Sequence, residues 1–305
     1  MKKSTQIVIL LLILVLFFHS YTKHAEDLRN TNAQNNIVAK QENERIKNLR
    51  EQKKVLQDKL EIAKQDLVVP NMGTTILLIS DTNKECLNDI VSKIDEYNYA
   101  GIIAIDNNYS PIDNIEGYLN INDINSLVDK GYEVVLKVSG SDDVAKLYEL
   151  YSKYFNIMGF YYPSANITKS QVEYYKQINI KNIIIHDTEL NDEEIFSIPS
   201  IGSYESNART AFDEANAKSK TMAFTVGYSV DGDKYTDANF SSMLERMNKS
   251  KNEGSTDIGN ITKSLDRYEE YKEYLNSDEY KQIQSVVDDI QSQIDDIDIQ
   301  INSKQ

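Results

Sequence analysis

The chain has 305 residues, a formal net charge of −15 and no tryptophan. Such an excess of acidic side chains argues against nucleic acid as a partner. A single cysteine, Cys86, excludes an internal disulfide, and three histidines limit the possible metal chemistry. No metal or other cofactor is predicted for the chain.

The chain opens with two lysines and an unbroken apolar run. Lys2 and Lys3 precede IVILLLILVLFF at Ile7–Phe18, a pattern typical of a signal peptide or a signal anchor. Twelve helical residues cover about 18 Å of the roughly 30 Å hydrocarbon core, and Ser4–Tyr21 approaches a full span. A cleavage site would need small residues where Lys23 and His24 stand, so residues 1–24 are predicted to be an uncleaved signal anchor.

This anchor predicts where the chain resides. Lysines in front of the apolar run favour a cytoplasmic N-terminus. The protein is then expected in the cell membrane as a single-pass protein, attached through its N-terminal helix, with the bulk of the chain extracytoplasmic. The alternative is secretion after cleavage of the signal.

Two further segments carry heptad patterns. Residues 25–68 are predicted to form a helical coiled-coil stalk, because apolar residues recur at steps of three and four from Ile46 to Leu67, with Lys53 at one seam position. Residues 264–303 are predicted to form a C-terminal helix, whose seam runs from Ile283 to Ile301 and whose aspartates make it acidic. Basic residues slightly outnumber acidic ones in the first segment.

Three arrangements of these helices fit the pattern. The two segments can pair within one chain as an antiparallel hairpin with matched charges. They can instead form a homo-oligomeric coiled coil. The remaining possibility is an amphipathic helix that lies on the domain.

Residues 69–252 alternate short apolar runs with helical stretches. The runs are continuous, as expected for parallel strands buried on both faces, so the fold class is α/β with a seven-stranded (β/α) barrel. Functional chemistry in such barrels lies at the carboxyl ends of the strands. Gly-rich phosphate-binding motifs are absent, which argues against a nucleotide enzyme. The predicted strands are Thr75–Ser80, Gly101–Asp106, Glu133–Ser139, Gly159–Pro163, Asn182–His186, Ile198–Tyr204 and Met222–Tyr228.

The segment LNINDINSLVDKGYEVVLKV at Leu119–Val138 resembles the middle of polysaccharide deacetylase (NodB-homology) domains. Ile90–Ile105 looks like the first helix and second strand of that family, Thr74–Asp81 like its first strand, and Gly159–Pro163 like the strand with its Arg–Pro motif. The resemblance implies a seven-stranded barrel and hydrolysis of an N-acetyl group from a glycan by a metal-bound water, with one Asp and two His as ligands.

The resemblance also implies which residues occupy the functional positions. Ser80 stands at the position of the catalytic base, and Asp81 at that of the metal-ligating Asp. Lys137 and Ser141 stand where the two His ligands belong, and Tyr161 stands at the Arg of the Arg–Pro motif. The late strand ends in Thr225-Val226-Gly227-Tyr228 without the family histidine. The resemblance therefore implies a catalytically inactive member that binds no metal.

For such a member we expect a binding role. The barrel would bind, or help to assemble, cell-envelope polysaccharide, or contact an envelope protein. Tyrosines near strand ends can stack on sugars and hydrogen-bond them, and the alternative is that they cap the barrel core. The candidate ligand-binding residues are Asp81, Asp106, Tyr162, His186, Tyr204 and Tyr228.

Other readings remain open. An active carbohydrate deacetylase or glycan hydrolase with an altered site would use zinc or another divalent metal. A scaffold protein of the cell envelope would act through its coiled coils. His186 with the adjacent Asp187 is a possible acid–base pair, or simply a solvated histidine. Lys137 is also predicted to form a salt bridge with Asp81 in the position that the metal would occupy.

Overall fold

The computed structural model of the protein describes residues 2–67, 73–227 and 238–303, with the side chains of residues 2–7, 10 and 238 excepted. The chain divides into two compact units. One contains Met1–Val68 together with Ser277–Gln305, and the other contains Val69–Asn276.

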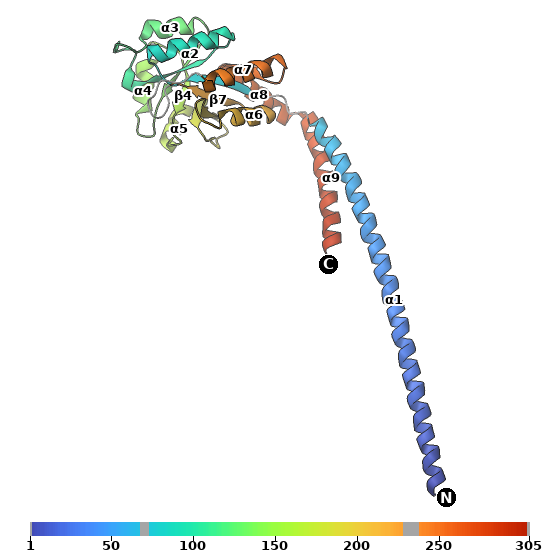
Figure 1. Ribbon diagram of the computed structural model, residues 1–305. Coiled ribbons are helices and arrows are strands. Elements are labelled where there is room, and N and C mark those ends of the chain that lie inside the picture. The colour runs from blue at the N-terminus through green and yellow to red at the C-terminus, as the bar shows by residue number, and fades with distance from the viewer. Residues whose placement is uncertain (1, 68–72, 228–237, 304–305) are drawn as a thin grey trace. The chain divides into compact units, whose positions relative to one another are not determined.

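The Val69–Asn276 unit is a parallel β-barrel surrounded by helices (Figure 1). The strands follow one another around the ring in chain order, and β1 pairs with both β7 and β2, which closes it. This confirms the predicted seven-stranded (β/α) barrel. The seven strands are β1 Thr74–Ile79, β2 Ile102–Asp106, β3 Glu133–Lys137, β4 Ile157–Tyr162, β5 Asn182–His186, β6 Phe196–Gly202 and β7 Met222–Val226.

Helices connect the strands, and several begin at a side chain that caps the first turn. The Asn83 side chain accepts hydrogen bonds from the backbone at the start of α2, and Asn120 and Thr168 form capping boxes at α3 and α5. Such caps satisfy backbone N–H groups that the helix leaves without partners. The helices are α2 Lys84–Glu96, η1 Asn107–Tyr109, α3 Ile121–Val128, α4 Val144–Tyr151, α5 Lys169–Gln177, α6 Ala208–Ala217 and α7 Ala238–Asn252.

The barrel has two separate apolar cores, because successive side chains of a strand point to opposite faces. The larger core lies between the sheet and the helices and contains residues such as Leu77, Ile103 and Tyr162. The smaller core fills the barrel interior. Its members are Ile76, Leu78, Ile102, Ala104, Val135, Tyr161, Ile184, Ile198, Ala223 and Ile261.

The last member of the interior core comes from a helix that follows the barrel. A short strand, β8 (Asp257–Ile258), pairs with β1 at Thr74 and Thr75 and leads into α8 (Ile261–Asn276). Ile261 is fully buried, and its backbone N–H donates to Oε2 of Glu133, the first residue of β3, at 2.9 Å. The first turn of α8 therefore closes the amino end of the barrel, and the barrel unit extends beyond the predicted residue 252.

The predicted C-terminal helix over 264–303 is two helices. The first is α8, and the second is α9 (Asp278–Asn302). Ser277 interrupts them, because its extended backbone and its side chain, which accepts from the Tyr280 N–H at 3.1 Å, cap the start of α9.

The other unit pairs α9 with α1 (Lys2–Asp66), a single helix that includes both the apolar N-terminal run and the predicted stalk. Leu60 of α1 packs against Val287 and Ile294 of α9. The Lys53 ammonium lies 2.6 Å from the Asp298 carboxylate. Residue numbers rise along one helix as they fall along the other, so the two helices run antiparallel.

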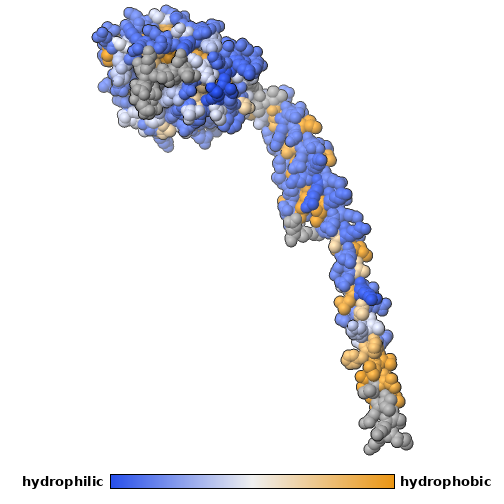
Figure 2. Space-filling view, in the orientation of Figure 1, coloured by the Kyte–Doolittle hydropathy of each residue, from blue (hydrophilic) through white to orange (hydrophobic). Residues whose placement is uncertain are grey.

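The apolar run near the start of α1 is exposed on all sides. The described side chains between Val8 and Phe18 have exposed fractions of 48% to 74%. Figure 2 shows this part of α1 as a hydrophobic band. Within the described part of the chain, no helix combines the length and the apolar character that crossing a membrane requires.

Candidate functional site

Polar side chains form the layer of the barrel interior at the carboxyl ends of the strands. Ile102 and Ala104 of β2, Val135 of β3 and Ile184 of β5 face the interior. Because side chains alternate along a strand, Asp106, Lys137 and His186 face the same way two residues further on. This end of a (β/α) barrel is where active sites are found. We call this layer the barrel mouth.

The first feature of the mouth is an ion pair between neighbouring strands. Asp106 and Lys137 are register partners on β2 and β3, and their charged groups lie 2.9 Å apart. The Asp106 side chain is 15% exposed and that of Lys137 is 29% exposed. The other carboxylate oxygen of Asp106 accepts from the backbone and side-chain nitrogens of Asn108, both at 2.9 Å. Three donors thus fix the Asp106 carboxylate.

The predicted salt bridge between Lys137 and Asp81 is therefore wrong. Lys137 pairs with Asp106 because β3 adjoins β2, whereas Asp81 follows β1, one strand further around the ring. Asp81 instead accepts a hydrogen bond from the Asn83 N–H at 2.8 Å, in the turn that starts α2.

Tyr161 forms the floor of the mouth. It is the register partner of Lys137 on β4, and it is only 4% exposed. Burial, and secondarily the neighbouring Tyr204 and Glu205, raises the pKa of the Tyr161 hydroxyl above its usual range, although a hydrogen bond with Thr225 partly opposes this. The hydroxyl therefore remains protonated well into the alkaline range and can donate a hydrogen bond.

A second pair lies on the other side of Tyr161. Nε2 of His186, at the end of β5, lies 3.5 Å from Oε1 of Glu205, which follows β6. The same carboxylate oxygen accepts from the Gly202 N–H at 3.2 Å, so Glu205 is held in place. The side chains of His186 and Glu205 are 31% and 29% exposed. The two pairs thus flank the buried Tyr161.

Tyr204 lies across the end of β6 because residue 202 is a glycine. A Cβ at Gly202 would lie 2.7 Å from Cζ of Tyr204 and 3.1 Å from Oε1 of Glu205. Tyr204 is half-buried, and burial together with the nearby Glu205 raises its pKa. The absence of a side chain at Gly202 therefore lets Tyr204 and Glu205 approach the mouth together.

A polar hollow adjoins this part of the mouth. It has a volume of about 320 Å³. Glu205 belongs both to this hollow and to the pair with His186. The residues that line it are Ser203, Glu205, Ser206, Ala208, Arg209, Thr210, Asn239 and Met243.

The remaining predicted residues lie at the edge of the mouth or outside it. Ser80 directly follows β1, and its hydroxyl donates to the Val226 carbonyl at 3.2 Å. Ser141 is exposed in the loop after β3, where its hydroxyl lies 2.9 Å from that of Ser139. Ser141 is four residues past the strand end, so it does not reach the interior layer.

Tyr162 must be removed from the set of ligand-binding candidates. It is fully buried in the core between sheet and helices, where its hydroxyl hydrogen-bonds that of Tyr175. Since Tyr161 faces the interior, the next residue in the strand faces away from it. Tyr228 lies outside the described residues.

Glu205 is absent from the predicted candidates, although it directly follows the predicted strand Ile198–Tyr204. The signal that would have selected it is Gly202, which permits a side chain three residues later to fold back onto the strand end. In the described part of the chain, no group of three or more His, Cys, Asp or Glu side chains is placed to hold a metal ion.

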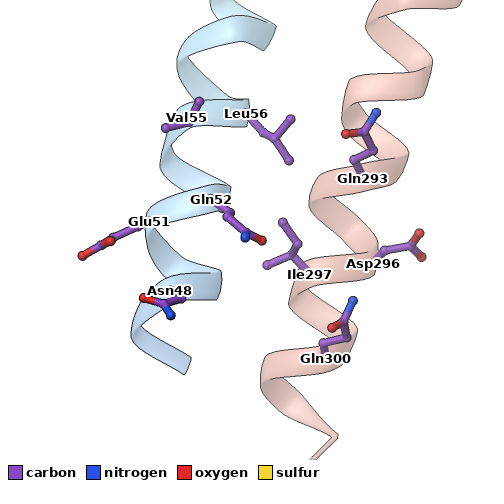
Figure 3. A pocket seen from close by; sticks show the side chains of 9 residues that line it. All are labelled: Asn48, Glu51, Gln52, Val55, Leu56, Gln293, Asp296, Ile297 and Gln300. Carbon is purple, nitrogen blue, oxygen red and sulfur yellow. The ribbon is translucent and has the colours of Figure 1, made fainter. Parts of the chain in front are cut away.

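The two-helix unit has a groove of its own. Figure 3 shows Leu56 and Ile297 pointing toward each other between α1 and α9, whereas Glu51 and Asp296 point away. The groove has a volume of about 670 Å³. It is lined by Asn48, Glu51, Gln52, Val55, Leu56, Gln293, Asp296, Ile297 and Gln300. It follows the seam between the helices and contains no imidazole, thiol or amine.

The barrel mouth therefore combines an ammonium, two carboxylates, an imidazole and a protonated phenol. Together these groups can donate and accept several hydrogen bonds to one polar ligand, and the His186–Glu205 pair can exchange a proton with it.

Comparison with known proteins adds little to this geometry. No protein-family model matches the chain, and no curated protein matches it. Among solved structures, it is similar to phospho-2-dehydro-3-deoxyheptonate aldolase (DAHP synthase) from Thermotoga maritima, with 11% identity and a TM-score of 0.39 over 61% of this chain and 72% of that one. The suspected membership of the polysaccharide deacetylase family is therefore wrong, because no family model matches the chain.

Proposed function

We propose that the protein is a membrane-attached carbohydrate-binding protein whose barrel mouth holds the sugar. The observation that carries this proposal is the pair of side-chain couples, Asp106–Lys137 and His186–Glu205, on either side of the Tyr161 floor. Glu205 of the mouth also lines the adjoining polar hollow of about 320 Å³, which offers room for part of a ligand.

The chemistry of the mouth suits a polyhydroxylated ligand. Each sugar hydroxyl donates one hydrogen bond and accepts others, so a sugar site needs donors and acceptors side by side. Lys137 and the protonated Tyr161 supply donors, and the carboxylates of Asp106 and Glu205 supply acceptors. The half-buried ring of Tyr204 offers an apolar face with a polar tip, which is a common surface for a sugar ring.

The membrane part of the proposal rests on the start of α1. An apolar helix surface exposed on every side is stable only where lipid or protein covers it. We favour lipid because the run has no polar face for a protein groove to distinguish, and because Lys2 and Lys3 precede it. The barrel would then lie on the extracytoplasmic side, where polysaccharide of the cell envelope is a ligand within reach.

The test of the sugar site is a binding measurement on the intact chain in detergent micelles. A printed array of mono- to hexasaccharides of glucose, N-acetylglucosamine, mannose and galacturonate would be followed by calorimetry on any hit. We expect Lys137→Met and Glu205→Gln each to weaken binding at least about tenfold, the equivalent of one good hydrogen bond to a charged group. The matched control is Lys153→Met, an exposed lysine before β4 at the other end of the barrel.

Two results would refute the sugar site. One is an array on which the intact chain binds no saccharide. The other is a saccharide whose affinity is unchanged by both mouth variants, because the ligand would then bind elsewhere. For the membrane part, the chain should float with phosphatidylglycerol–phosphatidylcholine vesicles, and replacing Leu12 and Val15 by Glu should abolish flotation.

The His186–Glu205 pair favours a second candidate, hydrolysis of a glycosidic bond. In that reaction a base takes a proton from the attacking water, and an acid gives a proton to the leaving oxygen. A histidine that a carboxylate orients is chemically suited to either proton transfer. Release of new reducing ends from a bound oligosaccharide, lost in His186→Gln while binding persists, would favour an enzyme over a binding module.

A further inference from the structure

Two tyrosines form a stacked pair in the connection between β2 and α3. The rings of Tyr109 and Tyr118 are nearly parallel, with an angle of 7° and a distance of 4.1 Å between centroids. Tyr109 ends the η1 turn after β2, and Tyr118 lies just before α3. We call this pair the tyrosine platform.

The platform is fixed to the carboxyl side of the barrel. Tyr118 forms an isolated antiparallel bridge with Asn83, the residue that caps α2. On either side of this bridge, the Lys84 N–H donates to the Gly117 carbonyl at 2.8 Å and the Leu119 N–H donates to the Thr82 carbonyl at 2.9 Å. The loop is therefore bonded along the segment that follows β1.

The platform is also connected to the mouth through one carboxylate. Asp106 binds Lys137 with one oxygen and the Asn108 backbone with the other, and Tyr109 is the next residue. The same side chain thus positions a charged group of the mouth and the turn that carries Tyr109. The short chain between them keeps the platform beside the mouth.

The platform is partly exposed to solvent. Tyr109 is 41% exposed although its ring stacks on Tyr118, and Ile115 of the same loop is 37% exposed. A ring that is already ordered by stacking loses little conformational entropy when a ligand covers it. A partly exposed, preordered aromatic ring next to a polar mouth is suited to contact an amphipathic ring.

We infer that the tyrosine platform is a second sugar subsite, so that the ligand is an oligosaccharide rather than a single sugar. One unit occupies the mouth between the two side-chain pairs, and a unit further along the chain stacks on Tyr109. This inference rests on the proposed carbohydrate-binding function and specifies the length of its ligand.

The experiment measures affinity as a function of chain length. Intact protein in micelles is titrated with one- to six-unit oligomers of whichever array sugar it binds. We expect affinity to rise by up to about tenfold between the monosaccharide and the oligomer that first reaches Tyr109, which is the scale of one aromatic contact. Tyr109→Ala should remove this rise and leave monosaccharide affinity unchanged, and Tyr109→Phe should retain it.

Tyr154 provides the matched control. It is 43% exposed, like Tyr109, but it precedes β4 and so lies at the amino end of the barrel. Tyr154→Ala should leave the dependence on chain length intact. Circular dichroism of the Tyr109 variants verifies that the loop change has not unfolded the barrel.

The possible outcomes distinguish failure of the second subsite from failure of the proposed carbohydrate-binding function. If affinity does not depend on the length of the oligosaccharide, the second subsite is overturned. The same holds if the increase in affinity with length persists in Tyr109→Ala. In both cases the mouth variants still test the sugar site in the barrel mouth. If the array yields no ligand, both the proposed function and the subsite fail. A rise lost equally in Tyr109→Ala and Tyr154→Ala also contradicts the subsite, because the effect would then not be local.

Discussion

The Lys137 ammonium is held 2.9 Å from the Asp106 carboxylate, across neighbouring strands and directly above the apolar interior of the barrel. Both side chains are less than one-third exposed. Removing one charge from such a pair leaves the other poorly solvated, and this cost exceeds the gain from the pair itself.

Lys137→Met should therefore lower the free energy of unfolding of the barrel by about 1–3 kcal/mol, and Asp106→Asn by a similar amount. Urea unfolding followed by near-ultraviolet tyrosine signals measures this. Lys153→Met removes an exposed lysine 3.9 Å from Glu149 and should change stability by less than about 0.5 kcal/mol. Equal effects at Lys137 and Lys153 would show that the mouth is as well solvated as the surface.

Removing the hydroxyl group should have opposite effects on stability at two buried tyrosines. The hydroxyl of Tyr99 is buried and has no hydrogen-bond partner among the described residues, whereas the hydroxyl of Tyr132 donates to Asp95 at 3.2 Å. Tyr99→Phe should leave stability unchanged or raise it by up to about 1 kcal/mol, and Tyr132→Phe should lower it by about 1 kcal/mol. The same thermal or urea unfolding curve measures both variants. A loss in Tyr99→Phe would mean that its hydroxyl has a partner.

Alkaline pH should destabilise the barrel through its tyrosines. Burial is the main cause that raises the pKa of Tyr99 to about 12 and the pKa values of Tyr161, Tyr162 and Tyr175 above their usual range. Unfolded tyrosines lose their protons near pH 10, while these folded ones keep them. The unfolded state therefore binds fewer protons above about pH 10, and stability falls from there upward.

The urea midpoint should accordingly be flat from pH 8 to 9.5 and fall steeply by pH 11. The double variant Tyr162→Phe/Tyr175→Phe removes two of the contributing hydroxyls, so its midpoint should fall less steeply over the same interval. A wild-type midpoint that is constant to pH 11 would contradict the raised pKa values.

The helix pair α1–α9 can be tested separately from the barrel. Leu60 is 8% exposed against Val287 and Ile294, while Ile62, two residues later, is 62% exposed. Leu60→Ala should lower the free energy of separating α9 from α1 by about 1–3 kcal/mol. This is less than the cost of a large core cavity, because the two helices pack along only one seam. Faster proteolysis within α9, with the barrel fragment left intact, measures this. Ile62→Ala is the control, and the protease should cleave this variant at the wild-type rate.

The barrel was predictable because each strand is a continuous apolar run, and such runs form only when both faces of a sheet are covered. The two-residue strand β8 could not be predicted, because two residues are too few to show a periodic pattern of apolar side chains. The break at Ser277 was missed because the amphipathic pattern continues across it, and only the capping geometry separates α8 from α9.

The site was predictable in position but not in detail. A parallel barrel brings its carboxyl ends together, so Asp106, Lys137 and His186 were placed correctly at one edge. Successive side chains of a strand point to opposite faces, so only one of Tyr161 and Tyr162 faces the barrel interior. Two adjacent tyrosines in the sequence do not reveal which one it is. The partner of Lys137 depends on which strands are neighbours. The deacetylase resemblance failed because a helix, a Gly–Tyr–Glu turn and an apolar strand satisfy the general requirements of any (β/α) repeat.

Because the first turn of α8 closes the amino end of the barrel, the smallest fragment that contains a complete barrel must include this helix. A fragment that ends after α7 would keep all seven strands but lose Ile261, leaving a hole in the interior and Glu133 without the N–H that it accepts. Crystallisation or binding work on the isolated barrel should therefore retain residues through Asn276, and insertions or tags would be best tolerated after that point.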